Sequence, residues 1–212
     1  MNLLSQLRQQ RLLAIVRGDD PAAVLASARV LADEGIRLIE ISLTSRSAVS
    51  VLSRARLELG DSIALGAGTV VTTADACAAV AAGASYLVTP CTGAGAREGR
   101  RLGTPVLVGA LTPTEVVTAL DDGASAVKLF PAQLGGPDYL RALRAPFPEV
   151  PFVPVGGVDL AAAHEYLAHG AVAVGLGSPL LGDAPDGGDL AALRFRAREL
   201  RAAVPPLAGD EI

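Results

Sequence analysis

Lys128 is the only lysine in the chain; the other 17 of its 18 basic side chains are arginines. It lies in the apolar run 126–130. A lysine withdrawn from water can lose its proton and act as an amine nucleophile, whereas an arginine cannot. An apolar strand beside Arg17 should lower the pKa of Lys128. This placement predicts Schiff-base formation with a ketone. The alternative is a structural ion pair between Lys128 and Glu40.

Glu40 is a second charged residue in an apolar run, 38–43. A buried carboxyl group has a raised pKa and can serve as a general acid and base. Schiff-base chemistry needs such a proton shuttle. Alternatively, Glu40 is a buried carboxylate neutralised by Lys128 or Arg17. Charged residues on three different predicted strands favour a functional site, because unpaired charges inside apolar strands are costly.

Two small-residue turns, Gly156-Gly157 and Gly177-Ser178, follow the last two predicted strands. In (β/α)8 barrels, these turns often bind phosphate through backbone N–H groups. Turns also need glycine for conformational reasons alone. Together, the two turns predict a phosphorylated ligand.

Other residues near predicted strand ends carry weaker signals. Cys91 could line the pocket as a small filler, with no histidine nearby to activate it. His164 and His169 are five residues apart on a predicted helix exterior and suggest no metal site. Gly68 is expected to let a substrate approach the backbone.

These residues must be positioned by a repeated unit, in which a β-branched run is followed by a helical segment and a Gly or Pro. Eight such units predict one (β/α)8 barrel domain over residues 1–212, with a short helix before the first strand and a C-terminal helix and tail. An open doubly wound sheet is the alternative, but the first strand ends without a dinucleotide fingerprint. The predicted strands are Leu12–Arg17, Leu38–Leu43, Ile63–Gly68, Tyr86–Thr89, Val106–Ala110, Ala126–Phe130, Phe152–Val155 and Val172–Leu176.

Composition excludes several classes of protein. The net charge is −4 and no basic run is present, which argues against nucleic-acid binding. The uncharged window 76–96 is long enough to cross a bilayer, but its Gly, Thr and Pro content predicts a helix, a turn and a strand. Cys77 and Cys91 form no metal or disulfide framework. We expect a cytoplasmic protein with no membrane contact.

The chain resembles the 2-keto-3-deoxy-6-phosphogluconate (KDPG) and 4-hydroxy-2-oxoglutarate (KHG) aldolase family from about Leu12 to Leu181. Several ordered motifs at the right spacing make the resemblance specific. The matching segments are AIVRG (14–18), IEISLT (39–44), GAGTV (66–70), LVTP (87–90), VKLFPA (127–132), VPVGGV (153–158) and GLGS (175–178).

The resemblance implies a homotrimeric class I aldolase with no metal or organic cofactor, acting on a small 2-keto acid or phosphosugar substrate. Lys128 would form the Schiff base, and Glu40 would act as general acid and base, partly through a bound water. The remaining roles would be carboxylate binding by Arg17 and Thr69, packing on the ketimine by Pro90 and Phe130, and phosphate binding by Gly156, Gly157, Gly177 and Ser178.

One position departs from the family pattern. Many members have an arginine four residues after the glutamate, where this chain has Thr44, and the nearest arginine is Arg46. The substrate therefore stays open between the phosphogluconate and phosphogalactonate epimers and unphosphorylated 4-hydroxy-2-oxoglutarate. Two alternative functions for the whole protein also stay open. One is a phosphosugar isomerase or epimerase that uses Glu40 as its base, and the other is a barrel that binds a phosphorylated ligand without catalysis.

Overall fold

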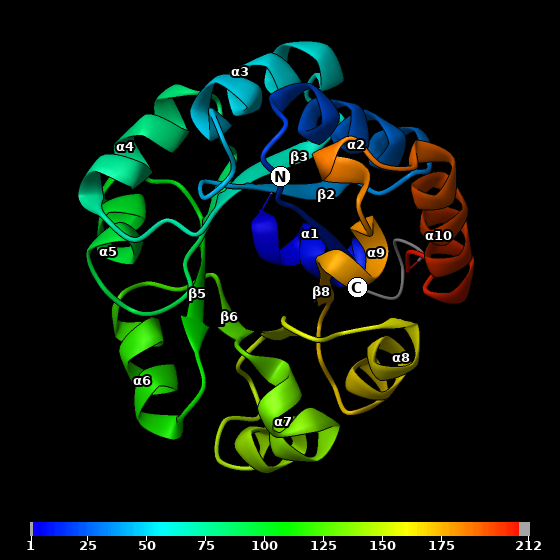
Figure 1. The fold of residues 1–212 in the computed structure, drawn as a ribbon. Coiled ribbons are helices and arrows are strands. Elements are labelled where there is room, and N and C mark those ends of the chain that lie inside the picture. The colour runs from blue at the N-terminus through cyan, green and yellow to red at the C-terminus, as the bar shows by residue number, and fades with distance from the viewer. Residues whose placement is uncertain (1, 208–212) are drawn as a thin grey trace.

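A computed structural model describes residues 2–207. Eight parallel strands alternate with helices in a nearly closed barrel, ordered β7-β6-β5-β4-β3-β2-β1-β8 (Figure 1). An isolated bridge between Val155 and Gly175 joins the two ends of the sheet. Each strand lies within a predicted run, which confirms the barrel. The strands are β1 (Leu12–Val16), β2 (Leu38–Ser42), β3 (Ala64–Gly68), β4 (Tyr86–Val88), β5 (Val106–Ala110), β6 (Ala126–Leu129), β7 (Phe152–Pro154) and β8 (Val174–Leu176).

Helices surround the strands as an outer ring (Figure 1). The short helix α1 (Leu3–Gln10) precedes β1, and its Leu3 and Leu7 pack into the barrel interior. The last helix of the described residues is α10 (Leu190–Ala203), where the sequence predicted a C-terminal helix. The others are α2 (Pro21–Asp33), α3 (Ala48–Leu59), α4 (Thr73–Ala81), α5 (Ala94–Arg101), α6 (Pro113–Asp121), α7 (Gly136–Arg144), α8 (Leu160–Ala168), α9 (Ser178–Leu181) and the 3₁₀ turns η1 (Ala132–Leu134) and η2 (Ala184–Asp186).

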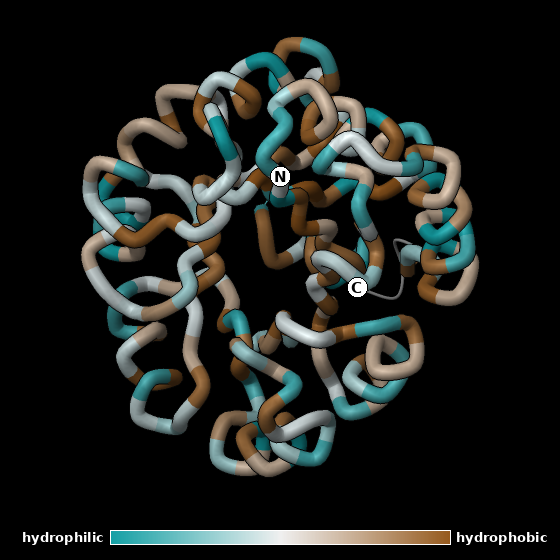
Figure 2. Tube along the Cα trace, in the orientation of Figure 1, coloured by the Kyte–Doolittle hydropathy of each residue, from teal (hydrophilic) through white to brown (hydrophobic). Residues whose placement is uncertain are grey.

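Both faces of the sheet are buried, so several strands, such as β1 and β5, are apolar throughout rather than alternating. Alternate side chains separate into two cores, one between strands and helices and a smaller one inside the barrel. In Figure 2 hydrophilic and hydrophobic segments alternate along the outer helices. The inner core supports the mouth of the barrel, where polar side chains replace apolar ones.

Helix ends follow the sequence signals. Thr112 and Glu115 form the predicted capping box at the start of α6, and Asp20 and Asp159 cap α2 and α8. The glycine after α4, Gly83, has a φ of +94°, a conformation that glycine adopts at little cost. These signals set the lengths of the helices and hence the positions of the strand ends.

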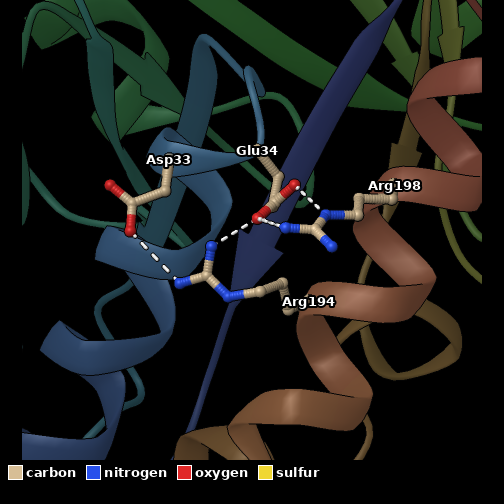
Figure 3. A network of polar contacts seen from close by, with 4 residues as sticks. All are labelled: Asp33, Glu34, Arg194 and Arg198. Atoms are coloured by element: carbon tan, nitrogen blue, oxygen red, sulfur yellow. Dashed lines mark hydrogen bonds and ion pairs between the residues drawn. The ribbon is translucent and has the colours of Figure 1, made fainter.

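A cluster of charged residues fastens α10 to α2, closing the ring of helices (Figure 3). Arg198 Nε donates to Glu34 Oε2 at 2.7 Å, and Arg194 pairs with both Glu34 and Asp33. The two guanidinium groups lower the pKa of Glu34. The C-terminal helix is thereby held against α2.

The uncharged window 76–96 contains the end of α4, a turn and the strand β4, as predicted, and also the start of α5. Within residues 2–207, no helix is long and apolar enough to cross a membrane. The predicted tail begins after α10, where the Leu207 N–H donates to the Gln9 carbonyl at 2.9 Å. Its acidic end, Asp210-Glu211, lies outside the described residues.

Candidate active site

A pocket of about 430 Å³ opens at the carboxyl ends of the barrel strands. Nine of the ten predicted site residues line it; the tenth, Glu40, is buried beneath its surface. A larger hollow of about 940 Å³ lies outside the barrel between α3 and α4, but it is shallow and contains none of the predicted residues. The barrel pocket is lined by Ile15, Arg17, Thr69, Pro90, Lys128, Phe130, Val155, Gly156, Gly157, Gly177, Ser178, Pro179, Leu181 and Gly182.

Lys128 projects into this pocket from β6 and is only 6% exposed. Its Nζ lies 4.9 Å from the centroid of the Phe130 ring. Burial lowers the pKa of Lys128, and nearby Arg17 lowers it further, while Glu40 opposes both effects. Among the described residues, no carboxylate oxygen lies within 4.0 Å of Nζ, so the structural ion pair with Glu40 is absent. These surroundings shift Lys128 toward its neutral amine form, and its side chain opens onto the pocket.

Glu40 lies on β2 with an exposure of 1%. Its Oε2 has no hydrogen-bond partner in the described part of the chain. Burial raises the pKa of Glu40, while the charges of Lys128 and Arg17 act in the opposite direction. With its pKa raised, this carboxyl group keeps its proton to a higher pH than a free glutamate does and can exchange it with a bound ligand.

The role expected for Gly68 was wrong. A Cβ at this position would lie 1.6 Å from Glu40 Oε1, so the missing side chain makes room for the carboxyl group rather than for a substrate. The two strands pair with Ser42 opposite Gly68, so the Glu40 side chain must extend along β3 to reach this site. Sequence spacing alone could not reveal this contact between neighbouring strands.

A chain of hydroxyl groups supports the arginine at the end of β1. Arg17 Nε donates to Ser42 Oγ at 3.4 Å. Ser42 Oγ also lies 2.8 Å from Thr44 Oγ1 and 3.0 Å from Thr69 Oγ1. Thr69 has a φ of +58°, which is rare and strained for a β-branched residue. Ser42 was missed from sequence, where it appeared only as part of a buried strand.

Another part of the pocket wall is made of backbone and small residues. Gly156 and Gly157 have φ values of +98° and +71°, which favour glycine. A Cβ on Gly157 would also lie 2.2 Å from the Gln133 side chain. Gly177 and Ser178 begin α9 on the neighbouring turn. This wall leaves backbone close to any ligand in the pocket.

The residues judged unlikely to act lie away from the pocket. His164 is exposed on α8 and His169 ends that helix, while Cys91 is exposed and outside the lining. In residues 2–207, no group of three His, Cys, Asp or Glu side chains could hold a metal ion. Sequence reasoning missed the apolar lining of Ile15, Val155, Pro179 and Leu181, which carries no polar signal.

A buried amine and a buried carboxyl group at the mouth of a (β/α)8 barrel define an enzyme active site of the kind that performs covalent carbonyl chemistry. The chain belongs to the KDPG and KHG aldolase family, whose model matches residues 3–193. It resembles the KDPG aldolase of Pseudomonas aeruginosa at 37% identity, covering 76% of this chain and 74% of that protein.

Two further relatives bear on the chemistry. The 2-dehydro-3-deoxy-6-phosphogalactonate aldolase of Escherichia coli is 34% identical, covering 80% of this chain and 83% of that protein. The KDPG aldolase of Legionella pneumophila, whose crystal structure contains pyruvate as a covalent carbinolamine intermediate, is 25% identical with a TM-score of 0.86. The match covers 93% of this chain and 97% of that one.

Proposed function

We propose that the protein is a class I aldolase that cleaves a 2-keto-3-deoxy-6-phospho-sugar acid into pyruvate and glyceraldehyde 3-phosphate. The observation that carries the proposal is the buried Lys128 amine, which has no ion-pair partner within the described residues and opens onto the pocket beside Glu40. Family membership and the trapped carbinolamine of the Legionella relative support the same chemistry.

The reaction begins when the Lys128 amine attacks the C2 carbonyl of the substrate. Glu40 supplies the proton with which the resulting hydroxyl leaves as water, and an iminium ion forms. The ionised Glu40 then takes the proton of the C4 hydroxyl, and the C3–C4 bonding electrons move into the iminium as the aldehyde departs. Glu40 returns this proton to C3 of the enamine, and attack of water on the new iminium then releases pyruvate, restores the Lys128 amine and reprotonates Glu40. The iminium thus serves as the electron sink.

The pocket walls divide the binding of the substrate between two ends. Arg17 and Thr69 hold the carboxylate, and the contact from Arg17 to Ser42 orients the guanidinium group. Pro90 and Phe130 pack on the ketimine. Gly156, Gly157, Gly177 and Ser178 receive the phosphate through backbone N–H groups and the serine hydroxyl. Holding both ends fixes C2 beside the amine, a proximity effect of several kcal/mol.

Borohydride trapping tests the chemistry directly. The protein is incubated with pyruvate and cyanoborohydride, and intact mass and peptide mapping then locate the adduct. We expect one reduced pyruvyl group on Lys128, lost in Lys128→Arg although that variant keeps the charge. An unmodified Lys128 would refute the proposal and favour a phosphosugar isomerase or epimerase that uses Glu40 alone as its base.

Substrate choice needs a separate assay. Lyase rates on the gluconate-type and galactonate-type phosphorylated acids and on unphosphorylated 4-hydroxy-2-oxoglutarate would rank the candidates. The glycine-lined wall supports a phosphorylated substrate. A preference for the unphosphorylated acid would instead assign the KHG activity that the family name includes.

The homotrimer is a prediction from the family resemblance, and the cytoplasmic location is a prediction from composition. Light scattering on the purified protein tests the first, with an expected mass three times the 21.5 kDa protomer. Cell fractionation tests the second.

A further inference from the structure

Tyr86 lies inside the barrel, at the level of Glu40. It is 1% exposed on β4 and belongs to the inner core. Gly66 on β3 pairs with Tyr86 on one side and with Glu40 on the other. A Cβ on Gly66 would lie 2.3 Å from Cε2 and Cζ of the Tyr86 ring. The absent side chain therefore lets the ring cross β3 toward the strand that carries Glu40.

The Tyr86 hydroxyl is buried and has no hydrogen-bond partner within residues 2–207. The same is true of Glu40 Oε2, and the charge of Glu40 acts on the Tyr86 phenol. Buried polar groups in proteins nearly always have partners. Two unpartnered atoms in one small interior, one a donor and the other an acceptor, therefore need an explanation.

The other tyrosines show that this is specific to Tyr86. Tyr166 donates to the Ala132 carbonyl at 2.9 Å, and Tyr139 donates to the Leu111 carbonyl at 2.8 Å. A phenylalanine at position 86 would fill the same core space without burying a hydroxyl. The hydroxyl group therefore calls for a role other than packing.

We propose that Tyr86 is a positioning residue for Glu40, whose phenol O–H donates to the Glu40 carboxyl group, directly or through one water molecule, during turnover. The proposal rests on the acid–base role proposed for Glu40. Burial and the nearby Glu40 charge raise the pKa of Tyr86 well above 10, so the phenol keeps its proton throughout. Its donation would stabilise the ionised carboxylate, the state that takes the C4 hydroxyl proton.

Three charged or titratable groups face Glu40: Lys128 on β6, Tyr86 on β4, and Arg17, which directly follows β1. Once substrate is bound, Lys128 is covalently engaged. The acid limb is the low-pH side of the kcat–pH profile, where kcat falls as pH is lowered. It reports the pKa of groups in the enzyme–substrate complex, and here that group is Glu40. Removing the phenol donor should make the Glu40 carboxylate harder to form and shift this limb to higher pH.

The test compares Tyr86→Phe with Tyr166→Phe, a matched control that also loses one buried hydroxyl. We expect Tyr86→Phe to lower kcat about ten- to a hundredfold, as for a hydrogen bond to a charged group, with little change in KM. The acid limb should move to higher pH. Tyr166→Phe should leave the pH profile in place. A kcat within twofold of wild type with an unmoved limb, or the same shift in both variants, would overturn the proposal.

A second variant keeps the test informative if Tyr86→Phe does not fold. Fluorotyrosine at position 86 keeps the hydroxyl and makes it a stronger donor, so the limb should move to lower pH; no movement, or movement to higher pH, counts against the role. End-point trapping of pyruvate on Lys128 is measured in parallel. If the wild-type protein does not form the pyruvate adduct, the aldolase proposal itself fails. If Lys128 is fully labelled in every variant but the acid limb does not move, only the role proposed for Tyr86 is rejected.

Discussion

Gly68→Ala offers a sharp test of how the site is built, because the change adds one methyl group where the Glu40 carboxyl group already lies. The new Cβ would be 1.6 Å from Glu40 Oε1, whereas ordinary contacts of this kind begin at 3.4 Å. The oxygen must therefore move by about 2 Å if the strand does not. A misplacement of about 1 Å can cost about a hundredfold in rate, and general acid–base catalysis as a whole contributes about 10²- to 10⁴-fold.

We therefore expect kcat of Gly68→Ala to fall by about 10²- to 10⁴-fold, equivalent to about 2.7–5.4 kcal/mol of barrier. Steady-state kinetics on the preferred phosphorylated acid measures this loss. Circular dichroism and thermal melting verify that the barrel has formed.

A double-mutant cycle identifies the cause. In a Glu40→Ala background, the new methyl group no longer meets a carboxyl group, so Gly68→Ala should cause little further loss. An equal loss in both backgrounds would show that the methyl group distorts the strand instead. A single variant that keeps more than a third of wild-type kcat would refute the geometric reasoning.

Four further predictions use other parts of the structure. Because burial lowers the pKa of Lys128, the rate of pyruvate trapping should rise with pH and level off below 10.5, the ordinary value; a rise that continues past 10.5 would contradict it. Because the pKa of Glu40 is raised above 4.5, the folded state binds a proton that the unfolded chain releases, and the contribution of Glu40 to stability declines as pH rises from 4.5 through its folded-state pKa. Urea titrations should therefore show Glu40→Gln gaining stability over wild type across that window and matching it at lower pH. Thr44→Arg should restore a substrate contact and lower KM for phosphorylated substrates by about tenfold, and an unchanged KM would remove Thr44 from the specificity argument. Thr112→Ala should cost about 1 kcal/mol of unfolding free energy through loss of the helix cap, with kcat unchanged.

The buried position of Glu40 lowers the stability of the barrel. An apolar residue at position 40 would avoid burying a polar oxygen without a partner in the described interior. The site instead keeps an acid whose pKa burial raises and whose position Gly68 permits. We infer that part of the stability of the barrel has been exchanged for proton transfer, and the Glu40→Gln titration measures that exchange.

The sequence by itself determined the barrel, because apolar runs, helix caps and glycine signals are local patterns that recur in every βα unit. It also identified Lys128 and Glu40, since charges inside apolar runs are costly and therefore conspicuous. The tertiary structure decided what no local pattern encodes. It revealed the space that Gly68 leaves for the Glu40 carboxyl group, the Ser42 hydroxyl linking Arg17 to Thr69, and the Tyr86 ring crossing Gly66. Each brings together residues on, or directly after, different strands, and it depends on strand register and side-chain direction, which are fixed only when the sheet closes.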